Sequence, residues 1–170
     1  MASFLEDINT VIHRDFRSSK KRMEECQASM RIDVDHTGSL SSFYSFDKAL
    51  GKEYKGGLFP FFAPVKGANK VCDFIVFAER ANRNYILLIE LKKGNSQTFP
   101  QLKAANDFIN YVIATVNRVC DKVYRPTIRL ISIHDIDLPK RPTAPTGIIY
   151  DDNNHHIVKS RRFVLKHYLV

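Results

Sequence analysis

The sequence lacks the features that mark several common protein classes. Its three cysteines, Cys26, Cys72 and Cys120, are far apart and form no Cys-x-x-Cys pair, so neither a disulfide framework nor a zinc knuckle is indicated. No apolar run approaches the roughly 20 residues of a membrane span, and the N-terminus does not read as a secretory signal. A glycine-rich phosphate loop, HExxH and GxSxG are also missing. These absences predict a soluble, cytoplasmic protein with reduced thiols.

Positive charge is the most prominent feature of the composition. The 170 residues carry a formal net charge of +8, which favours a polyanionic partner, with nucleic acid ahead of an anionic membrane surface. The alternative for each basic cluster is an ordinary solvated face. The clusters lie at 13–22, 52–57, 139–142 and 159–167. The candidate nucleic-acid-binding residues include one lysine at the end of a predicted strand. They are Lys20, Lys21, Arg22, Lys93, Lys140, Arg141, Arg161 and Arg162.

The first 57 residues are expected to be mainly helical. Ser3 followed by Glu6 fits a capping box, and apolar residues at helical spacing continue to Phe16. Residues 18–30 either extend or restart that helix, and residues 30–36 alternate apolar and polar side chains as a short strand does. We therefore expect a helical N-terminal region with one strand in it.

The segment "LFPFFAPV" (58–65) is aromatic and contains two prolines. Proline is excluded from central strands, so this segment is predicted to be an edge strand or a packed loop. Its rings either pack in the core or stack on nucleic-acid bases, and core packing is the favoured interpretation.

The middle of the chain predicts a β-hairpin followed by a long helix. "VCDFIVFAE" (71–79) and "YILLIELKK" (85–93) are strand-length apolar segments separated by a short polar turn. Apolar spacing then predicts a helix over 100–120 and a strand over 127–136. The tail from Gly147 is expected to be β-rich. The whole chain is thus predicted to be one mixed α/β domain.

The two hairpin strands contain charged residues, which are costly to bury without partners. If the hairpin is centred between Ala81 and Asn82, Asp73 lies directly opposite Glu90. Lys92 is two residues further along the strand and therefore shares the face of Glu90. One end of one sheet face would then carry two carboxylates and an ammonium group.

Two adjacent carboxylates repel each other unless a positive group lies between them. A hard divalent cation such as Mg²⁺ or Mn²⁺ is the natural ligand, with Asp73, Glu90 and the backbone carbonyl of Leu91 as candidate donors. Lys92 would orient or deprotonate a metal-bound water or neutralise developing charge. The alternative is a local ion pair without catalytic function. A second Glu-x-Lys triplet, Glu53-Tyr54-Lys55, lacks a flanking apolar strand and is interpreted as surface.

The pattern of an acid on one strand, Glu-x-Lys on the next, then a helix and another strand resembles the restriction-endonuclease-like, or PD-(D/E)xK, nuclease superfamily. The resemblance covers about residues 58–136, with Cys72 in place of the proline that often precedes the acid. It implies a central mixed β-sheet flanked by helices, here with a β-rich extension over 147–170. It also implies that Asp73 and Glu90 bind metal and that Lys92 is the catalytic lysine.

Two further positions follow from this resemblance. Many members add a glutamate from the first helix, for which Glu24 or Glu25 is the candidate because Glu6 is already explained by the capping box. Some members carry a glutamine in the helix after the Glu-x-Lys strand, and Gln101 stands at that place. The tyrosine that follows it in RecB-type nucleases has no match at Ala105. Gln101 is thus either a nucleic-acid contact or an ordinary surface residue.

The leading functional hypothesis is a metal-dependent endonuclease or exonuclease that hydrolyses phosphodiester bonds, with DNA preferred because most members of the superfamily act on DNA. A chain of this length without a separate recognition domain is expected to act as a homodimer or in a larger complex. The alternative is a non-catalytic nucleic-acid-binding or scaffolding subunit with the same fold. A third, weaker reading is an unrelated α/β interaction domain with an acidic protein partner. His155 and His156 are expected in a solvated turn, with metal binding as the alternative. His134 and Asp135 are expected at a strand end, either at the edge of the site or without a role in it.

Overall fold

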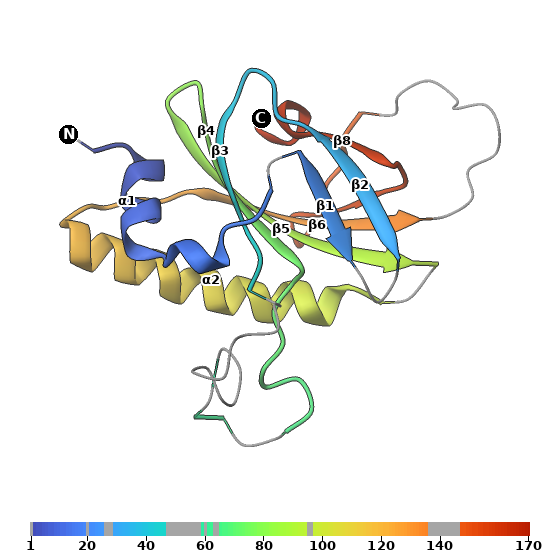
Figure 1. Cartoon of the computed structure of the whole chain (residues 1–170), viewed down its shortest axis with the longest axis horizontal. Coiled ribbons are helices and arrows are strands. Elements are labelled where there is room, and N and C mark those ends of the chain that lie inside the picture. The colour runs from blue at the N-terminus through green and yellow to red at the C-terminus, as the bar shows by residue number, and fades with distance from the viewer. Residues whose placement is uncertain are drawn as a thin grey trace.

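The chain is arranged in three layers, with helices on one face of a five-stranded sheet and a smaller sheet on the other (Figure 1). A computed structural model describes residues 2–19, 21–25, 29–46, 59, 61–62, 65–94, 97–135 and 147–170. The helices are α1 (Phe4–Val11) and α2 (Phe99–Cys120), with 3₁₀ turns at Arg14–Phe16 and Leu165–Tyr168. The strands are β1 (Arg22–Glu25), β2 (Met30–Asp35), β3 (Leu40–Tyr44), β4 (Phe74–Arg80), β5 (Arg83–Lys93), β6 (Thr127–Asp135), β7 (His155–Val158) and β8 (Arg162–Val164).

The main sheet has the strand order β3-β4-β5-β6-β7. Its first three strands are antiparallel neighbours, whereas β6 runs parallel to both β5 and β7. The parallel pairing of β5 and β6 requires a crossover, which α2 provides. The smaller sheet has the order β1-β2-β8, so the β-rich tail divides between the two sheets.

The apolar runs of β4 and β5 are continuous because both faces of these strands are buried. Ile75 and Leu88 face the cluster formed with α1 and α2, and Val76 and Leu87 face the cluster formed with the smaller sheet. All four side chains are fully buried. Because side chains alternate between the two faces of a strand, each strand contributes residues to both hydrophobic clusters.

Several elements agree with the sequence predictions. The capping box of Ser3 and Glu6 starts α1, and the predicted hairpin, long helix and following strand correspond to β4–β5, α2 and β6. The strand expected near residue 30 is β2. Ala81 and Asn82 both have positive φ, as the two central residues of a type I′ hairpin turn require. The turn is thus centred where the sequence indicated.

The N-terminal region is less helical than expected. Residues 22–25, predicted to extend or restart a helix, form β1, and β3 is a further strand in this region. In β1 the buried Met23 lies between exposed Arg22 and Glu24, which is the alternation of a strand with one buried face. Pairing with β2 completes its backbone hydrogen bonds.

Two other segments also depart from expectation. His155 and His156 open β7 rather than lying in the turn, which occupies the residues just before them. Phe61 and Phe62 lie outside any strand, and both are exposed rather than packed in the core. Lys20, the triplet 53–55, Lys140 and Arg141 lie outside the described residues.

None of the helices over the described part of the chain is long and apolar enough to cross a membrane. Cys72 and Cys120 are free thiols, as expected, and burial raises the pKa of the Cys72 thiol well above its usual value.

Candidate functional site

The hairpin register brings the predicted charged residues to one end of the main sheet. Phe74 pairs with Ile89 and Arg80 with Arg83, so one further step along the same register sets Asp73 opposite Glu90. Leu91 donates its backbone N–H to Asp73 Oδ2 at 2.6 Å. The register prediction is confirmed, and it places both carboxylates on the face that α2 covers.

Glu90 also contacts the predicted lysine. Lys92 Nζ lies 2.8 Å from Glu90 Oε1, and the Glu90 side chain is almost fully buried whereas that of Lys92 is 28% exposed. Asp73 is only 8% exposed. The buried carboxylates therefore connect to solvent on the side of Lys92.

Burial and like charge both act on Asp73. Burial, followed by the negative charge of Glu90, raises the pKa of Asp73 to about 7, although the hydrogen bond from Leu91 opposes the shift. Burial lowers the pKa of Lys92, but the hydrogen bond and charge of Glu90 outweigh it and the net pKa is raised. The site thus holds carboxylates that repel each other and a lysine that stays protonated at neutral pH.

A third carboxylate, that of Glu25, acts on the same groups. Its charge raises the pKa of both Asp73 and Lys92, so it lies close to them from the end of β1. Its neighbour Glu24 instead pairs with Arg31 at 3.0 Å on the exposed side of β1. Of the two candidates, Glu25 is therefore the one whose charge acts on Asp73 and Lys92, and it does so from a strand rather than from the predicted helix.

The donor chemistry of this cluster fits a hard divalent cation. In a strand the N–H and C=O of one residue point to the same side, so the carbonyl of Leu91 faces Asp73 as its N–H does. Across the described ranges, no group of three or more His, Cys, Asp or Glu side chains is placed to hold a metal ion. One or two carboxylates supplemented by water are nevertheless the usual protein ligands of Mg²⁺. Asp73 and Glu90 supply two such carboxylates.

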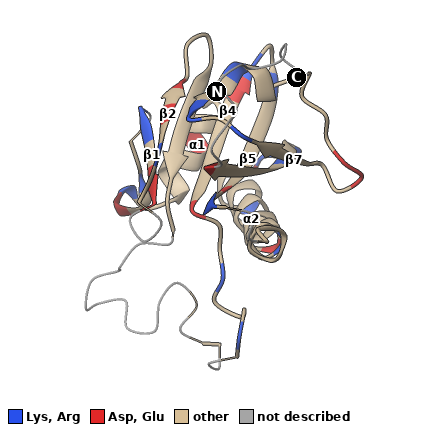
Figure 2. Ribbon diagram, turned by 90° about the vertical axis from the view of Figure 1, so that its right-hand side faces the viewer, with Lys and Arg blue, Asp and Glu red and all other residues tan. Residues whose placement is uncertain are grey.

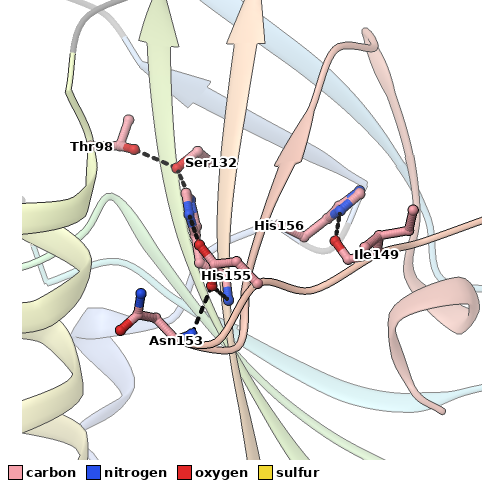
Figure 3. Close-up of polar contacts among 7 residues, drawn as sticks. Thr98, Ser132, Ile149, Asn153, His155 and His156 are labelled. Carbon is pink, nitrogen blue, oxygen red and sulfur yellow. Dashed lines mark hydrogen bonds and ion pairs between the residues drawn. The ribbon is translucent and has the colours of Figure 1, made fainter.

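A chain of polar side chains crosses the main sheet beside Glu90. Ser132 pairs with Glu90 in register, and its Oγ hydrogen-bonds to Thr98 Oγ1, at the start of α2, and to His155 Nε2 at 2.7 Å (Figure 3). His155 Nδ1 lies 3.5 Å from Asp151 Oδ2. Sequence reasoning missed this set of side chains because they come from three segments that are far apart in the sequence.

These side chains include the Ser, His and Asp of a hydrolase triad. Ser132 is fully buried, however, and its hydroxyl is enclosed by Thr98 and His155. A substrate therefore has no access to Ser132 Oγ. The geometry instead joins the start of α2 to β6 and β7 and supports the strand next to Glu90.

His134 and Asp135, which the sequence places at a strand end, have different partners. His134 lies opposite Lys92 in the β5–β6 register and donates from Nδ1 to the carbonyl of Gly94 at 2.6 Å. Asp135 Oδ1 lies 3.3 Å from Arg161 Nε. The His134 ring is thus held at the edge of the site by a backbone contact that selects its tautomer.

The predicted basic contacts are partly compensated by acids. Arg22 pairs with Asp33 at 3.3 Å and Arg162 with Asp35 at 2.9 Å, so with Arg161 three of the candidate arginines are in ion pairs. Figure 2 shows both charge colours on β1. Lys21 and Lys93 are exposed, and Gln101 is half-buried in the first turn of α2. Exposed ion pairs of this kind contribute little to stability.

Comparisons of this chain with protein-family models, with curated proteins and with solved structures found no match.

The raised pKa of Asp73 predicts a stability cost at high pH. The folded state holds this proton up to about pH 7, whereas the ordinary pKa of a free aspartate carboxyl is 3.8. Stability is therefore lost as pH rises between these values. In urea unfolding with EDTA, D73N should exceed wild type by on the order of 2 kcal/mol at pH 8 and converge with it near pH 4.

The exposed Asp152 provides the control for loss of one carboxylate, as D152N. The amide of D73N can still accept the hydrogen bond from Leu91. Any gain in the free energy of unfolding therefore comes from removal of the negative charge and not from a lost hydrogen bond. Equal stability of D73N and wild type at pH 8 would show that Asp73 carries no repulsion.

The polar chain predicts the opposite pH dependence at His155. Burial lowers the pKa of His155 from 6.5, against the charge of Asp151, so the folded state binds fewer protons and stability falls as pH drops through 6.5. The stability difference between H155Q and wild type should therefore shift in favour of H155Q from pH 7.5 to pH 5, as measured by chemical unfolding. H13Q, at an exposed histidine, is the matched control, and a pH-independent difference would contradict the prediction.

Proposed function

We propose that this protein is a metal-dependent nuclease that hydrolyses phosphodiester bonds in DNA. The observation that carries the proposal is the meeting of Asp73, Glu90 and Lys92 at one end of the main sheet. Buried carboxylates that repel each other are poor devices for stability, so their presence favours a functional interpretation. A perturbed carboxyl pKa beside a charged partner is typical of such sites.

The order of elements supports the resemblance to the PD-(D/E)xK nucleases. Asp73 precedes β4, Glu90 and Lys92 end β5, α2 follows, and β6 then lies parallel to β5. This is the sequence of acid, Glu-x-Lys, helix and strand that the resemblance requires. We infer a restriction-endonuclease-like core formed by α1, β3–β5, α2 and β6.

Each residue at the site has a distinct proposed role. Asp73, Glu90 and the Leu91 carbonyl would hold Mg²⁺ or Mn²⁺, with Glu25 as a further acid. When bound, such an ion lowers the pKa of a coordinated water and stabilises negative charge on phosphate. Lys92 is protonated at neutral pH because Glu90 raises its pKa, so its ammonium group would neutralise charge that develops on the phosphate. Lys93 and Gln101 would contact the nucleic-acid backbone.

One observation favours a second candidate, a non-catalytic nucleic-acid-binding subunit. Lys92 is ion-paired to Glu90 and Asp73 accepts from Leu91, so the three side chains can also satisfy one another within the protein. In that case the site would bind DNA or a partner without hydrolysis. Activity measurements separate the two candidates.

DNA cleavage should depend on a divalent metal ion and on Asp73 and Lys92. Incubation of wild type with single-stranded, duplex and branched DNA in Mg²⁺ or Mn²⁺ should yield products that EDTA abolishes. K92A and D73A should each lower the cleavage rate by about 100-fold or more, the range for loss of an acid–base or charge-stabilising group. K55A, in the second Glu-x-Lys triplet, is the matched control and should retain activity.

Equal rates in wild type, K92A and D73A would exclude these residues from catalysis. Binding without cleavage of every tested substrate would instead support the non-catalytic subunit.

The neighbouring glutamates of β1 offer a paired test of the metal site. Mn²⁺ binding, measured by calorimetry without DNA, should weaken about tenfold in E25Q, a loss comparable to that of an outer-shell partner. E24Q should bind as wild type does, because Glu24 pairs with Arg31 on the exposed side of β1. Equal Mn²⁺ affinities of E25Q and E24Q would remove Glu25 from the proposed site.

A further inference from the structure

Three phenylalanines before β4 form an aromatic cluster that is open to solvent. The ring centroids of Phe61 and Phe62 are 4.6 Å apart, and that of Phe59 lies 5.7 Å from Phe62. Phe61 is 76% exposed and Phe62 48% exposed. Exposed adjacent aromatic rings are unusual on a protein surface and often mark a binding site. We call Phe59, Phe61 and Phe62 the aromatic platform.

The platform is anchored to the folded core through Phe59. The Phe59 ring contacts that of Phe108 on α2, with centroids 5.5 Å apart, and Phe108 contacts Phe46 at 5.0 Å. Phe46 is buried. Edge-to-face contacts of this kind hold aromatic rings in defined orientations. The inner ring therefore links the platform to the core, and the outer two rings remain exposed.

The charge around the platform is positive. Residues 59–72 contain Lys66 and Lys70 and no acidic residue, and both lysines are exposed. Figure 2 shows blue segments on the loop that enters β4. A purely apolar partner would leave these charges without a role, whereas a polyanion with planar groups would use both features.

The loop leads directly into the proposed catalytic site. Lys70 is three residues before Asp73, so their Cα atoms lie within about 11 Å of each other. In Figure 1 the loop before β4 extends past α2, away from the main sheet. Because Lys70 is close to Asp73 in the chain, a ligand that contacts Lys70 would lie near the charged end of β4 and β5.

We propose that the aromatic platform and Lys66 and Lys70 bind single-stranded DNA, with unpaired bases stacked on Phe61 and Phe62 and phosphates held by the lysines. Base–aromatic stacking beside a basic track is the common chemistry of single-strand binding. This inference rests on the proposed function and narrows its substrate to DNA with an unpaired segment. In this proposal the DNA single strand enters the catalytic site from the loop before β4.

Binding in EDTA tests the inference separately from cleavage. Fluorescence anisotropy with labelled dT20 should show tighter binding than to a duplex of equal length. F61A/F62A should weaken dT20 binding about 5- to 100-fold for each stacked base. The control V123A removes apolar surface at an equally exposed position after α2 and should bind as wild type does. K66Q/K70Q should reduce the salt dependence by about two phosphate contacts.

A tryptophan reporter checks that the rings contact the bases. The chain contains no tryptophan, so F61W provides a single indole on the platform. Its emission should be quenched by dT20 and not by duplex DNA, because stacking requires unpaired bases. V123W is the matched reporter outside the platform and should respond to neither.

The inference would be overturned if F61A/F62A bound dT20 as tightly as wild type does, or if wild type bound duplex DNA as tightly as dT20. Tighter binding of rU20 than of dT20 would also overturn it. So would a wild-type dimer that dissociates in F61A/F62A, because the rings would then form a dimer interface. Failure of the proposed function looks different. If dT20 binds through the platform but no DNA is cut, single-strand binding stands and the nuclease proposal fails. If DNA is cut at unchanged rates in F61A/F62A and the platform does not bind dT20, the nuclease proposal stands and the single-strand-binding inference fails.

Discussion

The hydrogen-bonded register of β4 and β5 is the constraint on which the candidate site depends. Ala81 and Asn82 adopt the left-handed conformation of a two-residue turn, and this turn sets every pair along both strands. Because side chains alternate between faces, a slip of one residue would move Asp73 to the opposite face from Glu90. The burial of both strand faces opposes such a slip, since it would exchange the apolar residues of two cores.

The same register creates an electrostatic conflict that the fold tolerates. Asp73 and Glu90 are buried next to each other, and Glu25 adds negative charge from the smaller sheet. Lys92 offsets part of this charge through Glu90. Groups held this way cost stability in the absence of a cation, and proteins commonly accept such a cost where function requires it. The polar chain from Thr98 to His155 supports the adjacent strand.

The three-layer arrangement explains how distant segments reach one edge of the sheet. Both β5 and β6 end there because they are parallel and α2 returns the chain between them. The loop that carries the aromatic platform enters β4 at the same edge, and β1 brings Glu25 from the other layer. Acidic and basic groups from separate parts of the sequence therefore act on one position.

Local patterns in the sequence determined the hairpin, its register, α2 and the pairing of Asp73 with Glu90, because turn chemistry and hydrophobic period act over a few residues. Tertiary structure decided the rest. Residues 22–25 become a strand only because β2 pairs with them, and this pairing selects Glu25 over Glu24. His155 meets Ser132 only because β7 lies parallel to β6. Contacts between residues far apart in sequence are set by packing of whole elements, which local propensity does not encode.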